Sequence, residues 1–393
     1  PWDRGRPRPL RRIDFHSSSE RRMRPGAAAV PSIHPIVPPA FDSWAFLLSH
    51  FALSSLPPKI LNEVAGGRSV TIVLPRPPMM TFSLCFRFAG ALLLAAVFAS
   101  PLVAADKKVL LIAGAPSHGP GQHEHNAGVL LFQKALSGVK GLRVDVALNG
   151  WPKDPRAFDG VSGILIYSDG GARHPALQEN RLAELDRVLS KGVGLALIHY
   201  ATEPTKEKGQ KEFIRWVGGA FETDWSVNPH WTANFASIPA HPVTRGVKPF
   251  SLRDEWYFNL RFTEGMKAVT PLLAAVPDAS TVTRPDGAHS GNPTVRRLVA
   301  RGVPQIVSWA FERQGGGRGF GTTGGHYHTN WGQPDFRKMV LNAILWIAQI
   351  DVPVDGFESV ITAEDLAQNL DPKPAAKAKK AQPAAAVPAA TAK

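Results

Sequence analysis

Apolar runs alternate with helix-like segments along much of the chain after residue 106. Runs of strand length, most of them rich in Val, Ile and Leu, occupy 108–113, 142–148, 161–167, 193–198, 305–311 and 320–323. Apolar positions with helical spacing occupy 127–137, 177–191 and 334–349. Continuously apolar strands separated by helices predict an α/β fold, in which helices cover both faces of a mainly parallel sheet.

The remaining segments after residue 106 have weaker patterns. Residues 220–300 are expected to form a mixed insertion, and residues 352–372 a C-terminal extension with a short helix at 362–370. Residues 373–393 consist almost entirely of Ala, Pro and Lys, so they offer no core to bury and are predicted to be disordered. The folded unit is therefore expected to be one domain over 106–351.

The first 105 residues predict targeting rather than a folded domain. Residues 1–79 are rich in Arg and Pro without sustained periodicity, and we interpret them as disordered upstream translation. Residues 80–105 have the pattern of a signal peptide, with Arg87, an apolar run and small residues before a cleavage site after Ala105. The run is shorter than the roughly 20 residues that span a membrane, so no stable membrane anchor is expected. We expect export to the periplasm or the medium; the alternative is a long cytoplasmic extension before a buried helix.

Charge and cysteine content narrow the choice of function. The net charge of the chain is +13, but residues 106–372 contain 28 Lys and Arg against 27 Asp and Glu. Because the excess lies at the two ends, no nucleic-acid partner is expected for the folded unit. The single cysteine, Cys85, lies in the predicted signal peptide, so the exported chain would have neither a disulfide nor a thiol nucleophile.

Histidines concentrate where the predicted strands end. Of the ten histidines after residue 105, those that follow a strand end are His118, His123, His125, His174, His199, His326 and His328. The carboxyl ends of parallel strands form the ligand-binding edge of an open α/β sheet, so these histidines predict one shared site. Imidazole is a good ligand for zinc, copper, iron and nickel, and the His-Tyr-His segment would present two rings on one face if it were extended.

Two of these features have structural explanations that the sequence leaves open. His125 can cap the helix that follows it. Asp169, in the segment YSDGG, is either a turn residue or a site carboxylate. The glycine-rich segment 315–321 lacks the Gly-Lys-Ser/Thr ending of a phosphate loop, so we predict a hairpin there and expect no nucleotide cofactor.

Two adjacent carboxylates, Asp254 and Glu255, precede the aromatic pair Trp256 and Tyr257. A carboxyl group beside large apolar rings can have a raised pKa and act as an acid or base, and aromatic faces can stack on sugar rings. The alternative is a surface ion pair next to a tryptophan of the core.

Four segments of the chain together resemble the ThuA-like (trehalose-utilisation) family. They are LLIAGAPSHG near the start, GVGLALIHYA around His199, HPVTRGVKPFSLRDEWY, and GRGFGTTGGHYHTNWGQPDFRKMVLNAILWIA, and the resemblance covers about 108–350 in order. It implies a flavodoxin-like fold of the class I glutamine amidotransferase type, with the site at the turn after the fourth strand. Amidotransferases carry a cysteine at that turn, whereas this chain has His199, so glutamine hydrolysis by cysteine is excluded.

The resemblance also implies a substrate class, because the family is associated with disaccharide and keto-sugar metabolism and sometimes with a divalent metal. Our first hypothesis is an exported enzyme acting on a glycoside or keto-sugar with a bound divalent metal, zinc or a similar ion. The residues expected to hold the metal are His118, His123, His326 and His328, with His199 as a further candidate. The residues expected to take part in catalysis are His199, Glu255 and Asp254.

The second hypothesis is a carbohydrate-binding module without catalysis on the same fold. In either case the residues expected to contact the sugar are Tyr200, Trp256, Tyr257, Trp331 and Asp169. A serine hydrolase that pairs His199 with Ser117 or Ser168 is disfavoured, because the chain has no G-x-S-x-G nucleophile elbow. The sequence does not predict the oligomeric state.

Overall fold

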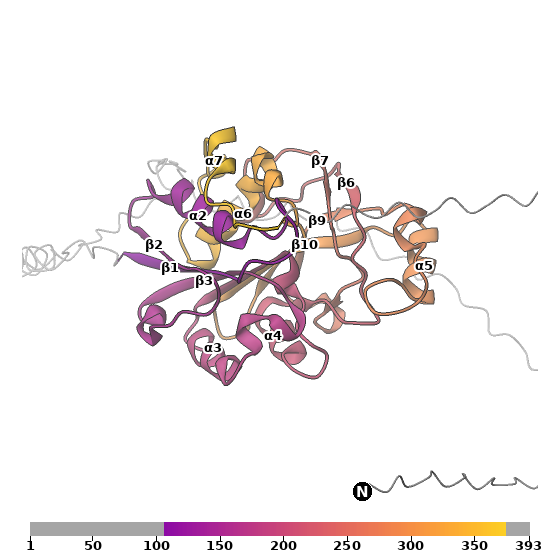
Figure 1. Cartoon of the computed structure of the whole chain (residues 1–393), viewed down its shortest axis with the longest axis horizontal. Helices are drawn as coiled ribbons and strands as arrows, with labels where there is room; N and C mark the ends of the chain where they lie inside the picture. The colour runs from indigo at the N-terminus through magenta and orange to yellow at the C-terminus, as the bar shows by residue number, and fades with distance from the viewer. Residues whose placement is uncertain (1–105, 375–393) are drawn as a thin grey trace, which may run out of the picture. The chain divides into compact units, whose positions relative to one another are not determined.

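A seven-stranded sheet forms the centre of the computed structural model, which describes residues 106–374 (Figure 1). Its strands, in the order β2-β1-β3-β4-β11-β10-β9, are β2 (Leu142–Ala147), β1 (Lys107–Ala113), β3 (Val161–Tyr167), β4 (Gly194–Ile198), β11 (Arg318–Thr322), β10 (Gln305–Glu312) and β9 (Val269–Ala275). The first five are parallel, whereas β10 is antiparallel to both of its neighbours. With β11 in fifth place this is the flavodoxin-like strand order, as predicted.

Helices cover both faces of the sheet because the buried strands present apolar side chains to both sides. Within β1, Leu111 belongs to the core on one side and Ile112 to the core on the other, as the two-residue period of a strand requires. Helices α2 (His125–Leu136) and α6 (Pro334–Ile347) pack on the first side. Helices α3 (Arg181–Leu189) and α4 (Gln210–Val217) pack on the second, seen below the sheet in Figure 1.

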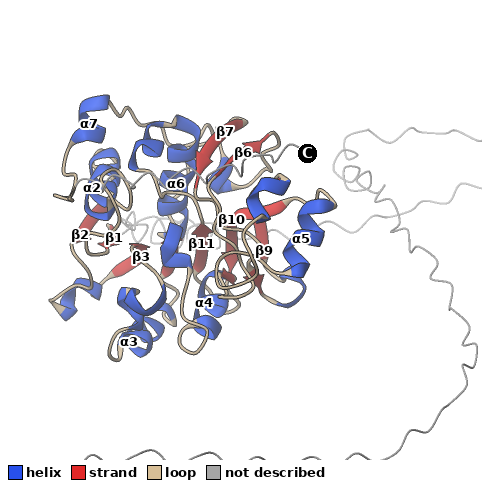
Figure 2. Cartoon of the chain, turned by 45° about the vertical axis from the view of Figure 1, so that its right-hand side comes forward, coloured by secondary structure: helices blue, strands red, loops and turns tan. Residues whose placement is uncertain are grey.

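The expected mixed insertion contains two small antiparallel sheets. They pair β5 (Gly219–Ala220) with β8 (Arg261–Phe262) and β6 (Trp231–Phe235) with β7 (Phe250–Asp254). The strands of the larger sheet, β6 and β7, are labelled in Figure 2. Strand β6 alternates buried and exposed residues, so only one of its faces joins the core. Helix α5 (Pro293–Ala300) follows and begins at Asn292, whose side chain accepts hydrogen bonds from two backbone N–H groups. This insertion carries Glu255 to the sheet edge.

The C-terminal extension is short and is held against the domain. Helix α7 (Ala363–Ala367) is shorter than the predicted 362–370 and begins with a capping box between Thr362 and Asp365. Most of the tail that was predicted to be disordered, 373–393, lies outside the described residues, but the structure describes 373 and 374. The Lys373 ammonium is almost completely buried and forms an ion pair of 3.1 Å with Glu124.

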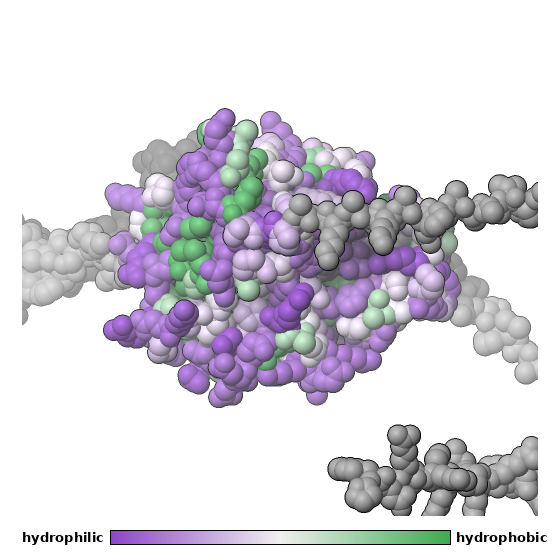
Figure 3. Space-filling view, viewed as in Figure 1, coloured by the Kyte–Doolittle hydropathy of each residue, from purple (hydrophilic) through white to green (hydrophobic). Residues whose placement is uncertain are grey.

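Several expectations concern residues outside 106–374. They include the upstream segment 1–79, the signal peptide 80–105 with Cys85, and the rest of the C-terminal tail. Among the described residues, no helix has the length and apolar content needed to cross a membrane. The face of the domain seen in Figure 3 is mostly hydrophilic and shows only small, separate apolar groups. Small apolar groups of this kind are ordinary for a protein surface in water.

Candidate functional site

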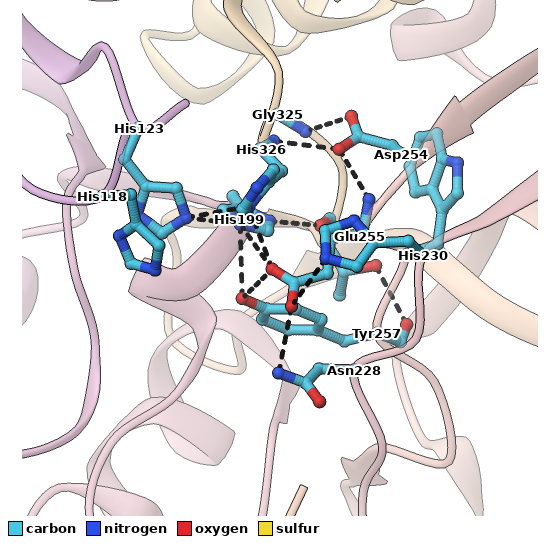
Figure 4. Close-up of polar contacts among 12 residues, drawn as sticks. His118, His123, His199, Asn228, His230, Asp254, Glu255, Tyr257, Gly325 and His326 are labelled. Carbon is cyan, nitrogen blue, oxygen red and sulfur yellow. Dashed lines mark hydrogen bonds and ion pairs between the residues drawn. The ribbon is translucent and has the colours of Figure 1, made fainter. Parts of the chain in front are cut away.

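Four side chains from distant parts of the sequence meet at the carboxyl edge of the sheet. His123 comes from the loop after β1, His199 from the turn after β4, and His326 from the loop after β11. Glu255 reaches them from the insertion, directly after β7. Figure 4 shows these groups pointing toward one another. The position is next to the point where the strand order reverses between β1 and β3, which is where ligands bind in open α/β sheets.

Three imidazole nitrogens converge in this cluster. His123 Nε2 lies 3.1 Å from His199 Nε2 and 3.0 Å from His326 Nδ1, and the last two lie 3.3 Å apart. In two of the rings, the nitrogen that faces away from the cluster donates a hydrogen bond. His199 Nδ1 donates to the Thr323 carbonyl at 2.7 Å, and His123 Nδ1 donates to Asp169 at 2.8 Å. If both rings were neutral, their Nε2 atoms would direct lone pairs toward each other, so the arrangement requires a proton or a cation between them.

Glu255 provides an oxygen at the same place. Its Oε2 lies 3.0 Å from His326 Nδ1 and 3.5 Å from His199 Nε2. Burial alone would raise the pKa of Glu255, but hydrogen bonds from these two histidines outweigh burial and hold its pKa well below the usual range. The carboxyl group is therefore ionised at neutral pH and acts as an acceptor or a ligand, not as the acid that was one of the two roles expected of it.

These distances fit a small divalent metal. Four ligands at about 2.0–2.1 Å from a tetrahedral zinc ion lie about 3.3–3.4 Å from one another. The four ligand atoms of His123, His199, His326 and Glu255 all lie within 4.8 Å of one another, and the shortest separations are close to the tetrahedral value. The hydrogen bonds to Asp169 and Thr323 are the outer contacts that orient metal-binding imidazoles in known sites. The donor set therefore suits zinc or a similar ion.

Burial keeps His123 in the form that binds metals. Desolvation, together with the neighbouring imidazoles, lowers the pKa of His123 far below its ordinary value, so its ring is neutral. Burial also opposes protonation of His199, but the hydrogen bond and charge of Glu255 outweigh it and raise the pKa of His199. In the ion-free protein, Glu255 thus favours the protonated form of His199.

The backbone at the site is held in uncommon conformations. His118, His123 and His199 all have positive φ angles, of 61°, 47° and 57°. Residues with a Cβ pay for this left-handed conformation, which persists where surrounding contacts fix it and is concentrated at functional sites. At His199 the turn directs the ring back over the end of β4 toward the cluster.

A second, more exposed group adjoins the first. His118, His123 and Asp169 also offer ligand atoms within 4.8 Å of one another, and the His118 ring stacks on His123 with 3.6 Å between centroids. Asp169 is buried and accepts hydrogen bonds from His123 and from Ser117 Oγ at 2.7 Å. The structure thus gives Asp169 the role of a site carboxylate that orients His123.

A family model matches most of the domain that contains this site. The model of the family described as ThuA, trehalose utilisation, matches residues 108–347, which is more than half of the chain. This chain belongs to the ThuA family. A solved ThuA-like protein from Bacteroides uniformis is 15% identical, covers 63% of this chain and 94% of its own, and has a TM-score of 0.46. No curated protein matches this chain.

All four groups of the cluster lie inside the ThuA match, whereas the C-terminal extension lies beyond it. The turn after β4 carries His199 in this ThuA chain, and the only cysteine is Cys85. Catalysis by a cysteine at this turn is therefore excluded.

Asp254, which was expected to take part in catalysis, has a structural role in this ThuA domain. Asp254 is completely buried and accepts hydrogen bonds from the backbone N–H groups of Gly325 at 2.7 Å and His326 at 3.0 Å, and from Asn330 at 2.9 Å. It is saturated with donors, so it positions the His326 loop instead of moving protons.

Three residues that were expected to contact a sugar or a metal, Trp256, Trp331 and His328, are buried away from the cluster. The rings of Trp256 and Trp331 are completely buried in the core, so they offer no face on which a sugar can stack. His328 is also buried, and it belongs to neither cluster. A 3-10 helix begins at His328, so the segment is not extended there and the rings of His326 and His328 do not share a face.

Two groups beside the cluster, His230 and Asn228, were not predicted from the sequence. His230 and Asn228 come from the irregular segment before β6; His230 Nε2 lies 3.7 Å from Glu255, and Asn228 donates to Glu255 at 3.1 Å. Tyr257, which was expected, lies with its hydroxyl 3.3 Å from both His199 and Glu255. Tyr200 is half-buried beside the His123 ring. No strand-end pattern marks His230 or Asn228, and only their proximity in the fold identifies them.

A buried carboxylate–histidine pair adjoins the same edge. Glu203, directly after the short 3-10 helix that follows β4, is buried and lies 2.7 Å from His289 Nε2. The hydrogen bond that His289 donates to Glu203 raises the pKa of His289, and burial raises the pKa of Glu203. Both residues were absent from the predicted site, because nothing in the sequence links the segment around 289 to the turn after β4.

Proposed function

We propose that this protein is an exported, metal-dependent enzyme that acts on a glycoside or a keto-sugar. The observation that carries the proposal is the convergence of His123 Nε2, His199 Nε2 and His326 Nδ1 within 3.0–3.3 Å of one another beside the carboxylate of Glu255. Structural histidines have no reason to direct three ring nitrogens at one point, whereas a metal site requires it. The family description, trehalose utilisation, supports a sugar substrate by analogy.

The residues of the site would hold an ion in two ways, as direct ligands or by orienting a ligand. His123, His199, His326 and Glu255 would be the ligands, and Asp169 would keep His123 in the tautomer that offers Nε2. When bound, a divalent ion of this kind supplies a Lewis acid for a carbonyl or hydroxyl oxygen of the substrate. The Glu255 charge is matched by this cation, which relieves the cost of burying a carboxylate.

Polar side chains at the exposed edge of the cluster would bind the sugar hydroxyls. His118 and His230 are partly exposed, with side chains 34% and 39% accessible, and both lie against residues of the cluster. Tyr200 and Asn228 add a hydroxyl and an amide at the same edge. Hydrogen-bonding groups of this kind recognise a polyhydroxylated substrate without an aromatic stacking platform.

Turnover distinguishes this proposal from a binding module on the same fold. Protein purified without chelator would be incubated with disaccharides and their oxidised keto forms, and products would be followed by chromatography. We expect turnover of at least one of these sugars, lost on treatment with a chelator and restored by zinc or a similar ion. Binding of a sugar with no turnover under any metal condition would contradict an enzyme and favour the module.

A further inference from the structure

The C-terminal extension contacts the loop that carries His123. This extension lies beyond the residues that match the family model, which end at 347. Helix α7 packs beside α2 and the segment after β11, and the partly buried Leu366 packs against the main core. An ion pair between Lys134 of α2 and Asp365 ties α7 to the domain. The chain then runs on to Lys373, next to the start of α2.

Lys373 places a buried ammonium against the backbone of the site loop. Its side chain is 3% exposed, and Nζ donates to the carbonyl oxygens of Gln122 and His123, the latter at 3.2 Å. Its third partner is Glu124 Oε1 at 3.1 Å. The ammonium therefore has two carbonyl acceptors and a carboxylate as counter-ion, and a buried cation is tolerated when it is paired and hydrogen-bonded in this way.

Glu124 joins the same loop to the extension. Its carboxylate accepts hydrogen bonds from the backbone N–H of Gly121 and of Asp371, both at 2.8 Å. Asp371 in turn accepts a hydrogen bond from Asn126 at 2.8 Å. The polar contacts of the Glu124 carboxylate thus lie either within the loop 121–124 or with the extension, so this side chain joins the two segments.

The loop needs such support because its backbone conformation is uncommon. Gly121 and His123 both have positive φ, and for His123 this conformation carries a steric cost. The other side of the loop is held by the segment after β11: the N–H of His123 donates to the His326 carbonyl at 3.0 Å, and the N–H of His328 donates to Gly121 at 2.9 Å. The loop is therefore clamped between the His326 segment and the extension.

We propose that Lys373 is a positioning residue that holds His123 in place for metal binding. The inference rests on the proposed metal site, but it concerns a segment outside the part of the chain that matches the family. Without the ammonium, the carbonyls of Gln122 and His123 lose a shared partner, and Glu124 is left as an unpaired buried charge. The His123 ring would then sample orientations that do not converge with His199 and His326. Loss of outer contacts around a metal site typically lowers affinity about 10–100-fold.

The test compares variants of the full chain with zinc alone as the probe. Lys373→Met removes the ammonium and keeps the length of the side chain. The double variant Glu124→Gln/Lys373→Met removes both charges together and avoids an unpaired buried carboxylate, in case the single variant folds poorly. Lys134→Met is the matched control, because it breaks another ion pair of the extension without contact to the site loop.

Two readouts separate the failure of this proposal from that of the metal site. Zinc affinity would be measured by competition with a chromophoric chelator, and hydrogen exchange of the peptide covering 117–127 would be measured in the ion-free protein. We expect a 10–100-fold loss of zinc affinity and faster exchange in both Lys373 variants, with neither change in Lys134→Met. If the wild type binds no zinc, the metal site is wrong, and faster exchange in the Lys373 variants would still show that Lys373 holds the loop. Unchanged affinity and unchanged exchange, even with a lower melting temperature, would overturn the proposal.

Discussion

At the scale of the single residue, the candidate site depends on which ring nitrogen of each histidine is already engaged. The Thr323 carbonyl fixes His199 and the Asp169 carboxylate fixes His123, and each contact leaves Nε2 for a ligand. A histidine without these contacts can be equally buried and still have no part in the site. His174 is such a residue: its Nδ1 accepts a hydrogen bond from the backbone of Ala176 and its ring packs against Phe213.

The first prediction concerns the metal ligands. Replacement of His199 or His326 by Ala should lower zinc affinity by at least 10–100-fold, since even outer contacts contribute that much. Asp169→Asn should lower it less than either, because the His123 ring remains. His174→Ala and His328→Ala serve as controls with unchanged affinity, and isothermal titration would measure all five. Equal affinities for His199→Ala and His174→Ala would show that His199 is not a ligand.

The second prediction concerns the dependence of stability on pH. Burial lowers the pKa of His174 to about 3, whereas an unfolded histidine titrates near 6.5. Since the unfolded chain takes up this proton first, the contribution of His174 is full above pH 6.5 and declines as the pH falls toward 3. Between pH 7 and pH 5 the loss is about 2 kcal/mol. Urea unfolding of His174→Asn, which keeps an acceptor for Ala176, should show a correspondingly smaller loss; an identical loss would show that other groups govern acid stability.

Sequence patterns predicted part of the site and missed another part for a physical reason. His118, His123, His199 and His326 follow strand ends, and the topology of a parallel sheet brings such residues together. His230 reaches the cluster from an irregular segment whose path depends on tertiary packing. Trp256 was predicted to contact a sugar because its sequence neighbours are site residues. Its own ring, however, is part of the core.

At the scale of the element, β4 and α6 pack with their backbones in close approach. A Cβ on Gly194 would lie 2.1 Å from the carbonyl oxygen of Ile347, a distance that no side chain can occupy. Glycine at the first residue of β4 therefore lets the helix sit directly on the strand that ends at His199. The close packing of this pair fixes the height of the β4 turn relative to the sheet.

The third prediction tests this packing. Gly194→Ala should lower the free energy of unfolding by about 1–3 kcal/mol or more, because either the strand or the helix must shift. Gly138→Ala is the matched control, since a Cβ there meets no atom within 4 Å and its φ is not positive. It should be neutral or slightly stabilising. Equal denaturation midpoints for the two variants would contradict the packing that the structure shows.

The elements that were predicted well are those with strong local patterns. Strand β3 was predicted at its observed bounds, and β1 and β4 within one residue, because buried parallel strands are continuously apolar. The helix predicted at 177–191 begins only at Arg181. Pro175–Leu177 forms a 3-10 turn instead, and Glu179 has a positive φ that interrupts the helix. The two-residue strands of the insertion carry no period, so only tertiary contacts define them.

At the scale of the whole molecule, the site joins residues more than 200 positions apart, such as His118 and His326. It therefore exists only when the domain is folded, and metal binding should be coupled to folding. The near balance of charge over 106–372 is consistent with a small-molecule ligand, since it gives no reason to expect a polyanion.

The fourth prediction concerns export. Protein expressed from Met80 in a bacterial host should be recovered outside the cytoplasm with Asp106 as its first residue, because residues 80–105 have the pattern of a signal peptide. Intact-mass analysis of the secreted or periplasmic fraction measures this directly. A mature chain that retains the segment before Asp106 would contradict export by cleavage at this site.

The measurement that tests the central claim most directly is the metal content of the folded protein. Elemental analysis would compare the wild type with the double variant His199→Ala/His326→Ala, both supplied with zinc and passed through a desalting column. We expect about one ion per wild-type chain and a large loss in the double variant, while His174→Ala matches the wild type. If the wild-type chain holds no more metal than the double variant, the proposed metal site is wrong and the histidines form a structural cluster.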